Sequence, residues 1–250
     1  MTLTTTLPHQ EQIITFIPRV QKPSLPKKIL VLDSGTLINL SMNGLLYIVP
    51  ELKKISNVQF VITEQVKYEI LDRPVSIPRF QLGALRIKEM IETDAIDLSS
   101  ELSISDQEVK EKTKELMNLA NQTVEAQGKF IKIVSDAEMS CLALSTLLTK
   151  KGIENIIAVD ERTTRILSEK PENLRKLMSK KLHFNVSLNK RNFSEFKDFK
   201  FIRSTELVYV AFKKGILRIK DPKALEAVLF ATKFKGSSVS FDEINALKKL

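Results

Sequence analysis

Residues 28–42 read KILVLDSGTLINLSM, and this stretch decides the fold class. It begins with a run of four apolar residues, 29–32, which is typical of a parallel strand buried on both faces. Asp33 follows the run, and the apolar spacing of residues 34–42 predicts a short helix. A second such run, residues 156–159, precedes Asp160 and another predicted helix, residues 161–168. In both places a buried strand is followed by an acidic residue and then a helix, and alternation of strands with helices is typical of a parallel α/β sheet.

The rest of the chain continues this alternation. Further strands are expected at residues 58–62, 96–98 and 200–203. Further helices are expected at residues 45–55, 64–71, 82–91, 106–127, 136–150, 207–214, 222–234 and 241–250. Thr63 and Ser135 are good helix N-caps, and Gly128 and Gly152 are placed to end helices. The pattern predicts an α/β fold with a parallel sheet, helices on both faces and closing C-terminal helices.

Composition bounds the kind of protein. The net charge of +9 favours a polyanionic partner such as RNA, although lysine-rich chains also occur among heat-stable proteins. A single cysteine, Cys141, and two distant histidines, His9 and His183, give no basis for a disulfide, a zinc site or a histidine triad. No apolar run reaches the roughly 18–20 residues of a membrane helix, and the start lacks a signal-peptide pattern. We therefore expect no membrane partner and a cytoplasmic location. Four of the nine prolines fall in residues 1–27, which predicts an extended N-terminal arm.

Four acidic residues stand where a predicted strand ends or a helix begins. They are Asp33, Glu69, Glu138 and Asp160. Each has an ordinary structural explanation. The two aspartates can cap helices, Glu138 completes a capping box with Ser135, and Glu69 can be a solvated helix residue.

Taken together, the four acids predict more than capping. In an open parallel sheet the carboxyl ends of the strands face one crevice, so these carboxylates are expected to meet there. Carboxylates placed together repel one another unless a hard cation neutralises them. Mg²⁺ or Mn²⁺ bound by them would suit phosphodiester hydrolysis. Glycine-rich phosphate loops, the competing explanation for a phosphate site, are absent from the sequence.

The chain resembles the PIN-domain nucleases. The resemblance rests on the order and spacing of ILVLDSGTLINL, VITEQVKYEIL, VSDAEMSCLALS and IIAVDERTTRIL. The later segment STELVYVAFKKGIL, followed by two helices, is similar to the end of prokaryotic PIN proteins of the VapC-like group. Together these segments cover residues 28 to about 70, 130–170 and 200–250.

The resemblance implies a metal-dependent ribonuclease with a flavodoxin-like sheet and an acidic centre. It assigns Asp33, Glu69, Glu138 and Asp160 as the four acids that hold metal and act in catalysis. Glu138 stands where the family often has Asp, and Asp136 could substitute for it or assist. Glu161 matches a frequent second acid after the fourth strand, and Thr205 matches a Ser or Thr that commonly lines the site.

The chain also departs from the family, because simple PIN toxins are much shorter. We interpret residues 28–250 as one PIN-like domain with insertions at about 72–130 and 170–200, which could serve substrate choice or self-association. The sequence leaves open a homodimer, a protein partner or an antitoxin. It also leaves open a toxin role as opposed to RNA processing.

The second insertion is rich in cations and phenylalanines. Two interpretations remain open: a surface for single-stranded RNA, or an amphipathic hairpin whose phenylalanines pack on the domain while its lysines are solvated. The candidate RNA contacts are Lys180, Lys181, Lys190 and Arg191.

The leading hypothesis is a Mg²⁺- or Mn²⁺-dependent endoribonuclease that acts on single-stranded or structured RNA. The alternatives are a PIN-like scaffold that binds RNA or protein without cutting, and a nuclease directed at DNA.

Overall fold

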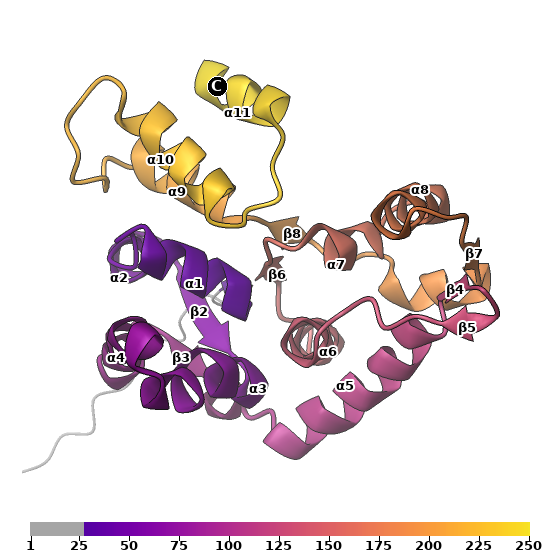
Figure 1. Ribbon diagram of the computed structural model, residues 1–250. Helices are drawn as coiled ribbons and strands as arrows, with labels where there is room; N and C mark the ends of the chain where they lie inside the picture. The colour runs from indigo at the N-terminus through magenta and orange to yellow at the C-terminus, as the bar shows by residue number, and fades with distance from the viewer. Residues whose placement is uncertain (1–27) are drawn as a thin grey trace, which may run out of the picture.

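A five-stranded parallel sheet forms the centre of the computed structural model, which describes residues 28–250 (Figure 1). The arm expected over residues 1–27 lies outside the described residues. In spatial order the strands are β3 (Asp97–Leu98), β2 (Val58–Ile62), β1 (Lys28–Leu32), β6 (Asn155–Ala158) and β8 (Phe201–Ile202). All four pairings are parallel. The predicted α/β fold with a parallel sheet is therefore confirmed.

The order of the strands reverses its winding between β1 and β6. The chain first adds β2 and β3 on one side of β1 and then returns to place β6 and β8 on the other. Counted along the five strands the order is 3-2-1-4-5, which is doubly wound and compatible with a flavodoxin-like fold in the broad sense, although the flavodoxin order itself is 2-1-3-4-5. Ligands of doubly wound sheets bind outside the carboxyl ends of the strands, where the winding reverses. Here that point lies beyond Leu32 and Ala158, which are register partners.

Helices cover the sheet so completely that residues Ile29, Leu30, Val31 and Leu32 of β1 are all buried. α1 (Ser34–Met42) follows β1 directly, and α2 (Ile48–Ile55) follows α1. α6 (Asp136–Lys150) packs against β1, β6 and α3 (Glu64–Lys67), and most of its residues are buried. α7 (Arg162–Ile166) is the short helix after β6.

The expected helix over residues 64–71 changes type within its length. α3 ends at Lys67, and a π-helical turn, Tyr68–Asp72, follows it. Thr63 caps α3 as expected, through a hydrogen bond from the Val66 amide to its hydroxyl. Glu69 therefore lies in a π-helical turn, a local widening that is often found at functional sites.

The two segments expected to be insertions, residues 72–130 and 170–200, meet in a small second sheet, although β3 of the central sheet also lies within the first. The first contains α4 (Pro78–Glu92), α5 (Asp106–Asn121), β4 (Val124–Ala126) and β5 (Lys129–Phe130), and the second contains α8 (Pro171–Leu182) and β7 (Ser187–Leu188). β4 pairs antiparallel with both β5 and β7. The helix expected to reach residue 127 thus stops at Asn121, because residues 124–126 pair with other strands. Gly128, with a φ of +75°, lies in the β4–β5 turn and does not end a helix.

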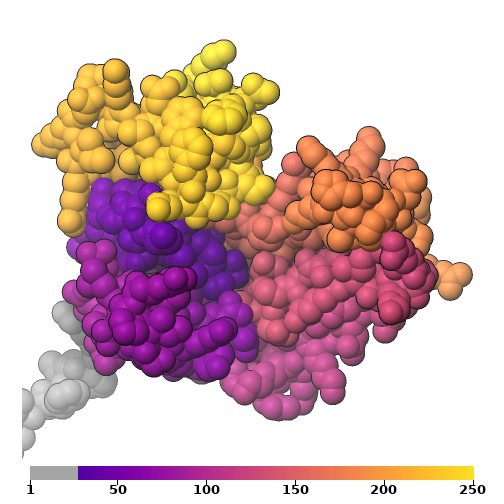
Figure 2. All heavy atoms as spheres, viewed as in Figure 1, coloured from indigo at the N-terminus to yellow at the C-terminus, as the bar shows by residue number. Residues whose placement is uncertain are grey.

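The C-terminal part comprises α9 (Ser204–Lys213), α10 (Ala224–Phe234) and α11 (Phe241–Lys249). Leu229, Val239 and Ile244 form a small separate core between them. α9 packs against α1 and α2, and Figure 2 shows the yellow C-terminal residues lying against the indigo segment that begins the described chain. Among residues 28–250, no helix combines the length and the apolar character needed to cross a membrane.

Candidate acidic site at the sheet edge

Asp33 lies at the carboxyl end of β1 and is only 3% exposed. It is the N-cap of α1, since its Oδ2 accepts a hydrogen bond of 3.1 Å from the Gly35 amide. Its Oδ1 is buried and accepts no hydrogen bond from any residue of the described chain. Burial, followed by the charges of Glu138 and Glu69, raises the pKa of Asp33 to about 7. Asp33 is thus both a helix cap and a carboxylate with one unsatisfied oxygen, and the two interpretations of this residue are compatible.

Glu138 is held between the start of α6 and α7. Its Oε2 accepts hydrogen bonds from the Ser135 amide at 3.1 Å and from the Thr164 hydroxyl at 2.7 Å. The first bond is half of the capping box that the sequence predicts. Burial raises the pKa of Glu138, and the charge of Glu161 adds to this effect. The charge of Glu138 in turn raises the pKa of Asp33, so the capping role leaves the two carboxylates electrostatically coupled.

Glu69, in the π-helical turn, is the second carboxylate whose charge acts on Asp33. The Ser34 hydroxyl, one residue after Asp33, donates a hydrogen bond of 3.0 Å to Glu69 Oε2. Within residues 28–250, neither Glu69 nor Glu138 accepts a hydrogen bond at Oε1. The structure thus gathers three of the four predicted acids, Asp33, Glu69 and Glu138, and we call these three the acidic cluster.

Asp160 is held in a separate hydrogen-bond network. Its Oδ1 accepts hydrogen bonds from the Ser204 amide at 2.8 Å, the Ser204 hydroxyl at 3.0 Å and the Ser237 hydroxyl at 2.9 Å. Its Oδ2 accepts one from the Asn39 side chain at 3.0 Å. These bonds join the end of β6 to α1, α9 and the loop before α11. Asp160 therefore fixes the elements around the acidic cluster, and the residue is only 4% exposed.

The three residues predicted to support the site, Asp136, Glu161 and Thr205, lie in different surroundings. Asp136 is exposed and pairs with Lys132 at 3.3 Å, so Glu138 is the acid of α6 that acts on Asp33. Glu161 caps α7; burial opposes its ionisation, but hydrogen bonds from Thr163 and Lys181 outweigh this and lower its pKa. Thr205 is fully buried and donates to the Ser237 hydroxyl at 2.7 Å, which makes it part of the Asp160 network.

The acidic cluster fits a divalent cation by its chemistry. Its donors are hard carboxylate oxygens, which Mg²⁺ and Mn²⁺ prefer, and the buried Oδ1 of Asp33 lacks a partner within residues 28–250. Within residues 28–250, however, no three His, Cys, Asp or Glu side chains already form a group that could hold a metal ion. Binding would therefore require the three carboxylates to move closer together, with the Oε1 atoms of Glu69 and Glu138, which accept no hydrogen bond within residues 28–250, as the available donors.

The basic insertion is largely a packed structural element. All four candidate cations are exposed; Lys181 pairs with Glu161 at 3.1 Å and Lys190 with Glu172 at 2.8 Å, whereas Lys180 and Arg191 form no ion pair within residues 28–250. Phe193 and Phe196 are buried in the main core and cannot stack on bases. The hairpin expected here is in fact the helix α8, the strand β7 and a 3₁₀ turn, Lys190–Phe196. Phe193 and Phe196 thus follow the packing interpretation, whereas Phe184 is exposed, and two of the four candidate cations form no ion pair within the described chain.

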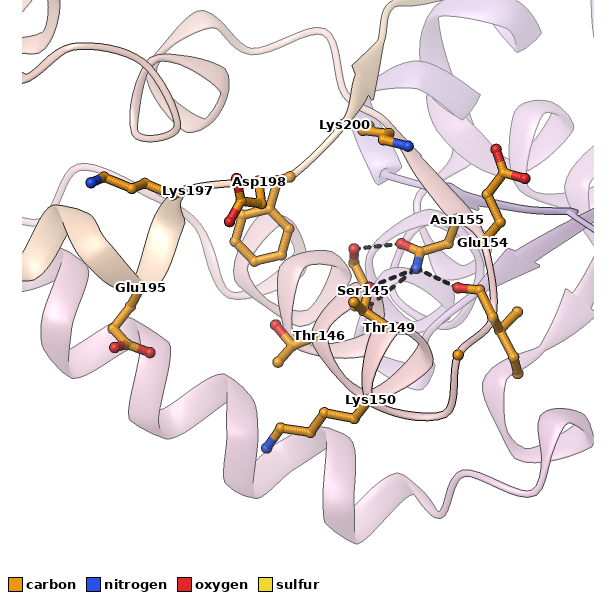
Figure 3. A pocket seen from close by; sticks show the side chains of 13 residues that line it. Ser145, Thr146, Thr149, Lys150, Glu154, Asn155, Glu195, Lys197, Asp198 and Lys200 are labelled. Atoms are coloured by element: carbon orange, nitrogen blue, oxygen red, sulfur yellow. Dashed lines mark hydrogen bonds between the residues drawn. The ribbon is translucent and has the colours of Figure 1, made fainter.

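A cavity of about 540 Å³ lies away from the acidic cluster, at the amino ends of β6 and β8 (Figure 3). Asn155 is one of its polar lining residues, and it donates to Thr149 and accepts from Ser145. The lining also includes three lysines and three acids, Lys150, Lys197, Lys200, Glu154, Glu195 and Asp198. Among residues 28–250 no three of the His, Cys, Asp and Glu side chains form a group that could hold a metal ion, and this includes the acids of this cavity.

Sequence patterns did not single out the residues that orient the acids. Ser34, Thr164, Asn39, Ser204 and Ser237 are polar residues of common types in helices and loops, and only their contacts across the fold distinguish them. The one signal in the sequence was proximity, because Ser34 follows Asp33 and Ser204 precedes Thr205. In comparisons with known proteins, the chain matches no protein-family model, no curated protein and no solved structure.

Proposed function

We propose that this chain is a Mg²⁺- or Mn²⁺-dependent endoribonuclease with a PIN-like fold. The observation that carries the proposal is the buried, unsatisfied Oδ1 of Asp33 beside Glu69 and Glu138, at the point where the sheet reverses its winding. Carboxylates that repel one another in a buried place cost stability unless a cation compensates them. A site that retains this cost is a candidate for function.

The residues divide the work between them. Asp33, Glu69 and Glu138 would hold the cation, which when bound would activate water and stabilise the charge on the phosphodiester. Ser34 and Thr164 orient the two glutamates through hydrogen bonds of 3.0 and 2.7 Å. Asp160 keeps α1 and α9 in place beside them. No side chain needs to act as the nucleophile.

Nucleic acid is the substrate class that the charge favours. The net charge of +9 raises the local concentration of nucleic acid around the protein. Lys180 and Arg191 are exposed on the insertion and can contact phosphates without breaking an ion pair within residues 28–250. Nothing in the charge pattern distinguishes RNA from DNA, so the substrate is settled by assay.

A non-catalytic scaffold that binds RNA or protein is the second candidate. It is favoured by one observation, namely that residues 28–250 contain no preformed group of three metal-binding side chains. In a scaffold the acidic cluster would repel a phosphate backbone, and binding would depend on the cations alone.

Cleavage assays distinguish the two. Single-stranded RNA, duplex DNA and flap DNA should be incubated with the protein in Mg²⁺, in Mn²⁺ and in EDTA. We expect RNA cleavage that requires the metal and is abolished in Asp33→Asn, with the exposed Asp136→Asn as the matched control. Undiminished cleavage in EDTA would contradict the metal role. RNA binding without any cleavage would favour the scaffold.

A further inference from the structure

A basic cavity lies beside α7, the helix whose Thr164 contacts Glu138. It has a volume of about 490 Å³, and its walls come from α7, the residue after β8, α10 and the loop before α11. Four cationic side chains line it: Arg162, Arg165, Arg203 and Lys233. The acids among its lining residues are Glu169 and Glu243.

These cations differ in how well they are compensated. Arg203 forms ion pairs with Glu206 and with Glu243, the latter at 2.7 Å, so its charge is balanced. Arg162, Arg165 and Lys233 form no ion pair with any residue in 28–250. Glu169 is exposed and accepts a hydrogen bond of 2.7 Å from Asn173. The cavity therefore has an excess of positive charge.

Arg165 carries the strongest sign of a missing ligand. Its Nη2 donates to the Ser238 carbonyl at 2.9 Å, but its buried Nε has no hydrogen-bond partner among the described residues. Burial and the neighbouring charge of Arg203 lower the pKa of Arg165. A buried donor on a charged side chain normally has an acceptor, because leaving it unsatisfied costs stability.

We propose that this cavity binds a phosphate group, with Arg165 and Arg162 as its principal donors. The planar guanidinium fork matches the oxygens of a phosphate. The unsatisfied Nε of Arg165 is buried, so it would join such a fork when the side chain turns toward the cavity. A cationic ligand is excluded by the charge. Lys233 adds positive charge, while its position 4.5 Å from the centre of the Phe241 ring limits its freedom.

The cavity is joined to the acidic site by consecutive residues. In α7, Thr164 donates to Glu138 and the next residue, Arg165, lines the cavity. The Ser237 hydroxyl and the Ser238 amide donate to Asp160, which fixes the cavity loop to the end of β6. One nucleic-acid strand could thus pass the acidic cluster and place another of its phosphates here. That assignment to a strand rests on the proposed nuclease function, whereas phosphate binding itself does not.

Calorimetric titration with inorganic phosphate in EDTA tests the site without any metal or cleavage. Removing one charge-assisted hydrogen bond should weaken binding by roughly tenfold or more, so Arg162→Gln and Arg165→Gln should both show this loss. Arg175→Gln is the matched control, because Arg175 is exposed on α8 and does not line the cavity. Arg162→Gln is expected to leave folding intact, since Arg162 is exposed, and it keeps the test decisive if Arg165→Gln unfolds.

A second arm identifies the source of the phosphate. Binding of short single-stranded RNA with a 5′-phosphate, with a 5′-hydroxyl, or of longer RNA with internal phosphates only, should be compared in EDTA for the same variants. If Arg162→Gln and Arg165→Gln bind all three RNAs more weakly than the wild type does, the cavity holds an internal phosphate. If they bind only the 5′-phosphorylated RNA more weakly, the cavity holds a terminal phosphate. The proposal is overturned if phosphate does not bind the wild-type protein, or if Arg162→Gln binds it as well as Arg175→Gln does. Failed cleavage with intact phosphate binding would count against the nuclease function alone.

Discussion

Replacing Asp33 with asparagine should stabilise the metal-free protein at alkaline pH while it abolishes cleavage. Asparagine keeps the shape of the side chain, and its carbonyl oxygen can still accept the hydrogen bond from the Gly35 amide. Its amide group would replace the unsatisfied Oδ1 with a donor near two glutamates. The substitution thus removes a repulsive charge without removing the cap.

The magnitude follows from the pKa of Asp33, which rises from 3.8 in the unfolded chain to about 7 in the folded one. Each pKa unit corresponds to about 1.36 kcal/mol, so ionising Asp33 in the folded state costs up to about 4 kcal/mol. Because the folded state holds its proton more tightly, this contribution to stability is greatest at low pH and falls as the pH rises toward and through 7. The raised pKa of Glu138 acts in the same direction.

Urea unfolding in EDTA at pH 5 and pH 8 measures this effect. The groups whose pKa is lowered, such as Glu161 and Glu243, titrate below this window and do not obscure it. We expect the stability advantage of Asp33→Asn over the wild type to be larger at pH 8 than at pH 5 by roughly 3 kcal/mol, because the unfolded aspartate is already ionised at pH 5 while the folded one loses its proton only near pH 7. Asp136→Asn should change stability by less than about 0.5 kcal/mol at either pH, because Asp136 is exposed.

Metal supplies the second half of the test. Mn²⁺ at pH 8 should raise the melting temperature of the wild type, by linkage to a native-state ligand, and leave that of Asp33→Asn unchanged. If Asp33→Asn were less stable than the wild type at pH 8 in EDTA, the buried charge would not be costly. The electrostatic argument for a cation at Asp33 would then be wrong.

Three further outcomes are expected. Glu138→Gln keeps the capping box and should alter stability by less than about 1 kcal/mol, while cleavage falls strongly; full cleavage would shift the third acid to Asp136. Asn39→Ala removes the donor to Asp160 and should cost about 1–3 kcal/mol in urea unfolding, whereas a neutral result would mean that water replaces it. A quadruple change to Gln should weaken RNA binding and reduce its salt slope by about 0.7 for each phosphate that is no longer neutralised, and an unchanged slope would assign the insertion a purely structural role. The four residues of that variant are Lys180, Lys181, Lys190 and Arg191.

The sequence predicted the central sheet well because the relevant signals are local. A four-residue apolar run between a lysine and an aspartate favours a strand buried on both faces, and residues 29–32 lie within β1. Capping chemistry is also local, so the start of α6 after Ser135 was predicted to the residue. The end of α5 was missed because β4 forms through pairing with β7, which lies far along the chain, and no local pattern reports such a pairing.

The candidate site was predicted in part for a similar reason. Asp33 and Asp160 have the same local context, an acid after a buried strand, and local patterns therefore predict the same role for both. The register separates them: Leu32 pairs with Ala158, so the counterpart of Asp33 is Val159 and Asp160 lies one residue further along. Side chains of extended backbone alternate in direction, and a shift of one residue changes the surroundings completely. Asp160 accordingly contacts Asn39, Ser204 and Ser237.

The same alternation brings Glu161 within electrostatic reach of the acidic cluster. Glu161 lies two residues after the counterpart of Asp33, its backbone is extended with φ −70° and ψ 129°, and its charge raises the pKa of Glu138. Its own charge is held by Lys181 of the insertion, at 3.1 Å. The insertion is therefore coupled to the acidic cluster through an ion pair, and removal of Lys181 would leave Glu161 as an uncompensated negative charge near Glu138. RNA binding by the quadruple variant must accordingly be compared with binding by a triple variant that retains Lys181. The triple variant loses phosphate contacts alone, whereas the quadruple variant also leaves Glu161 unpaired and increases the negative charge near the acidic cluster.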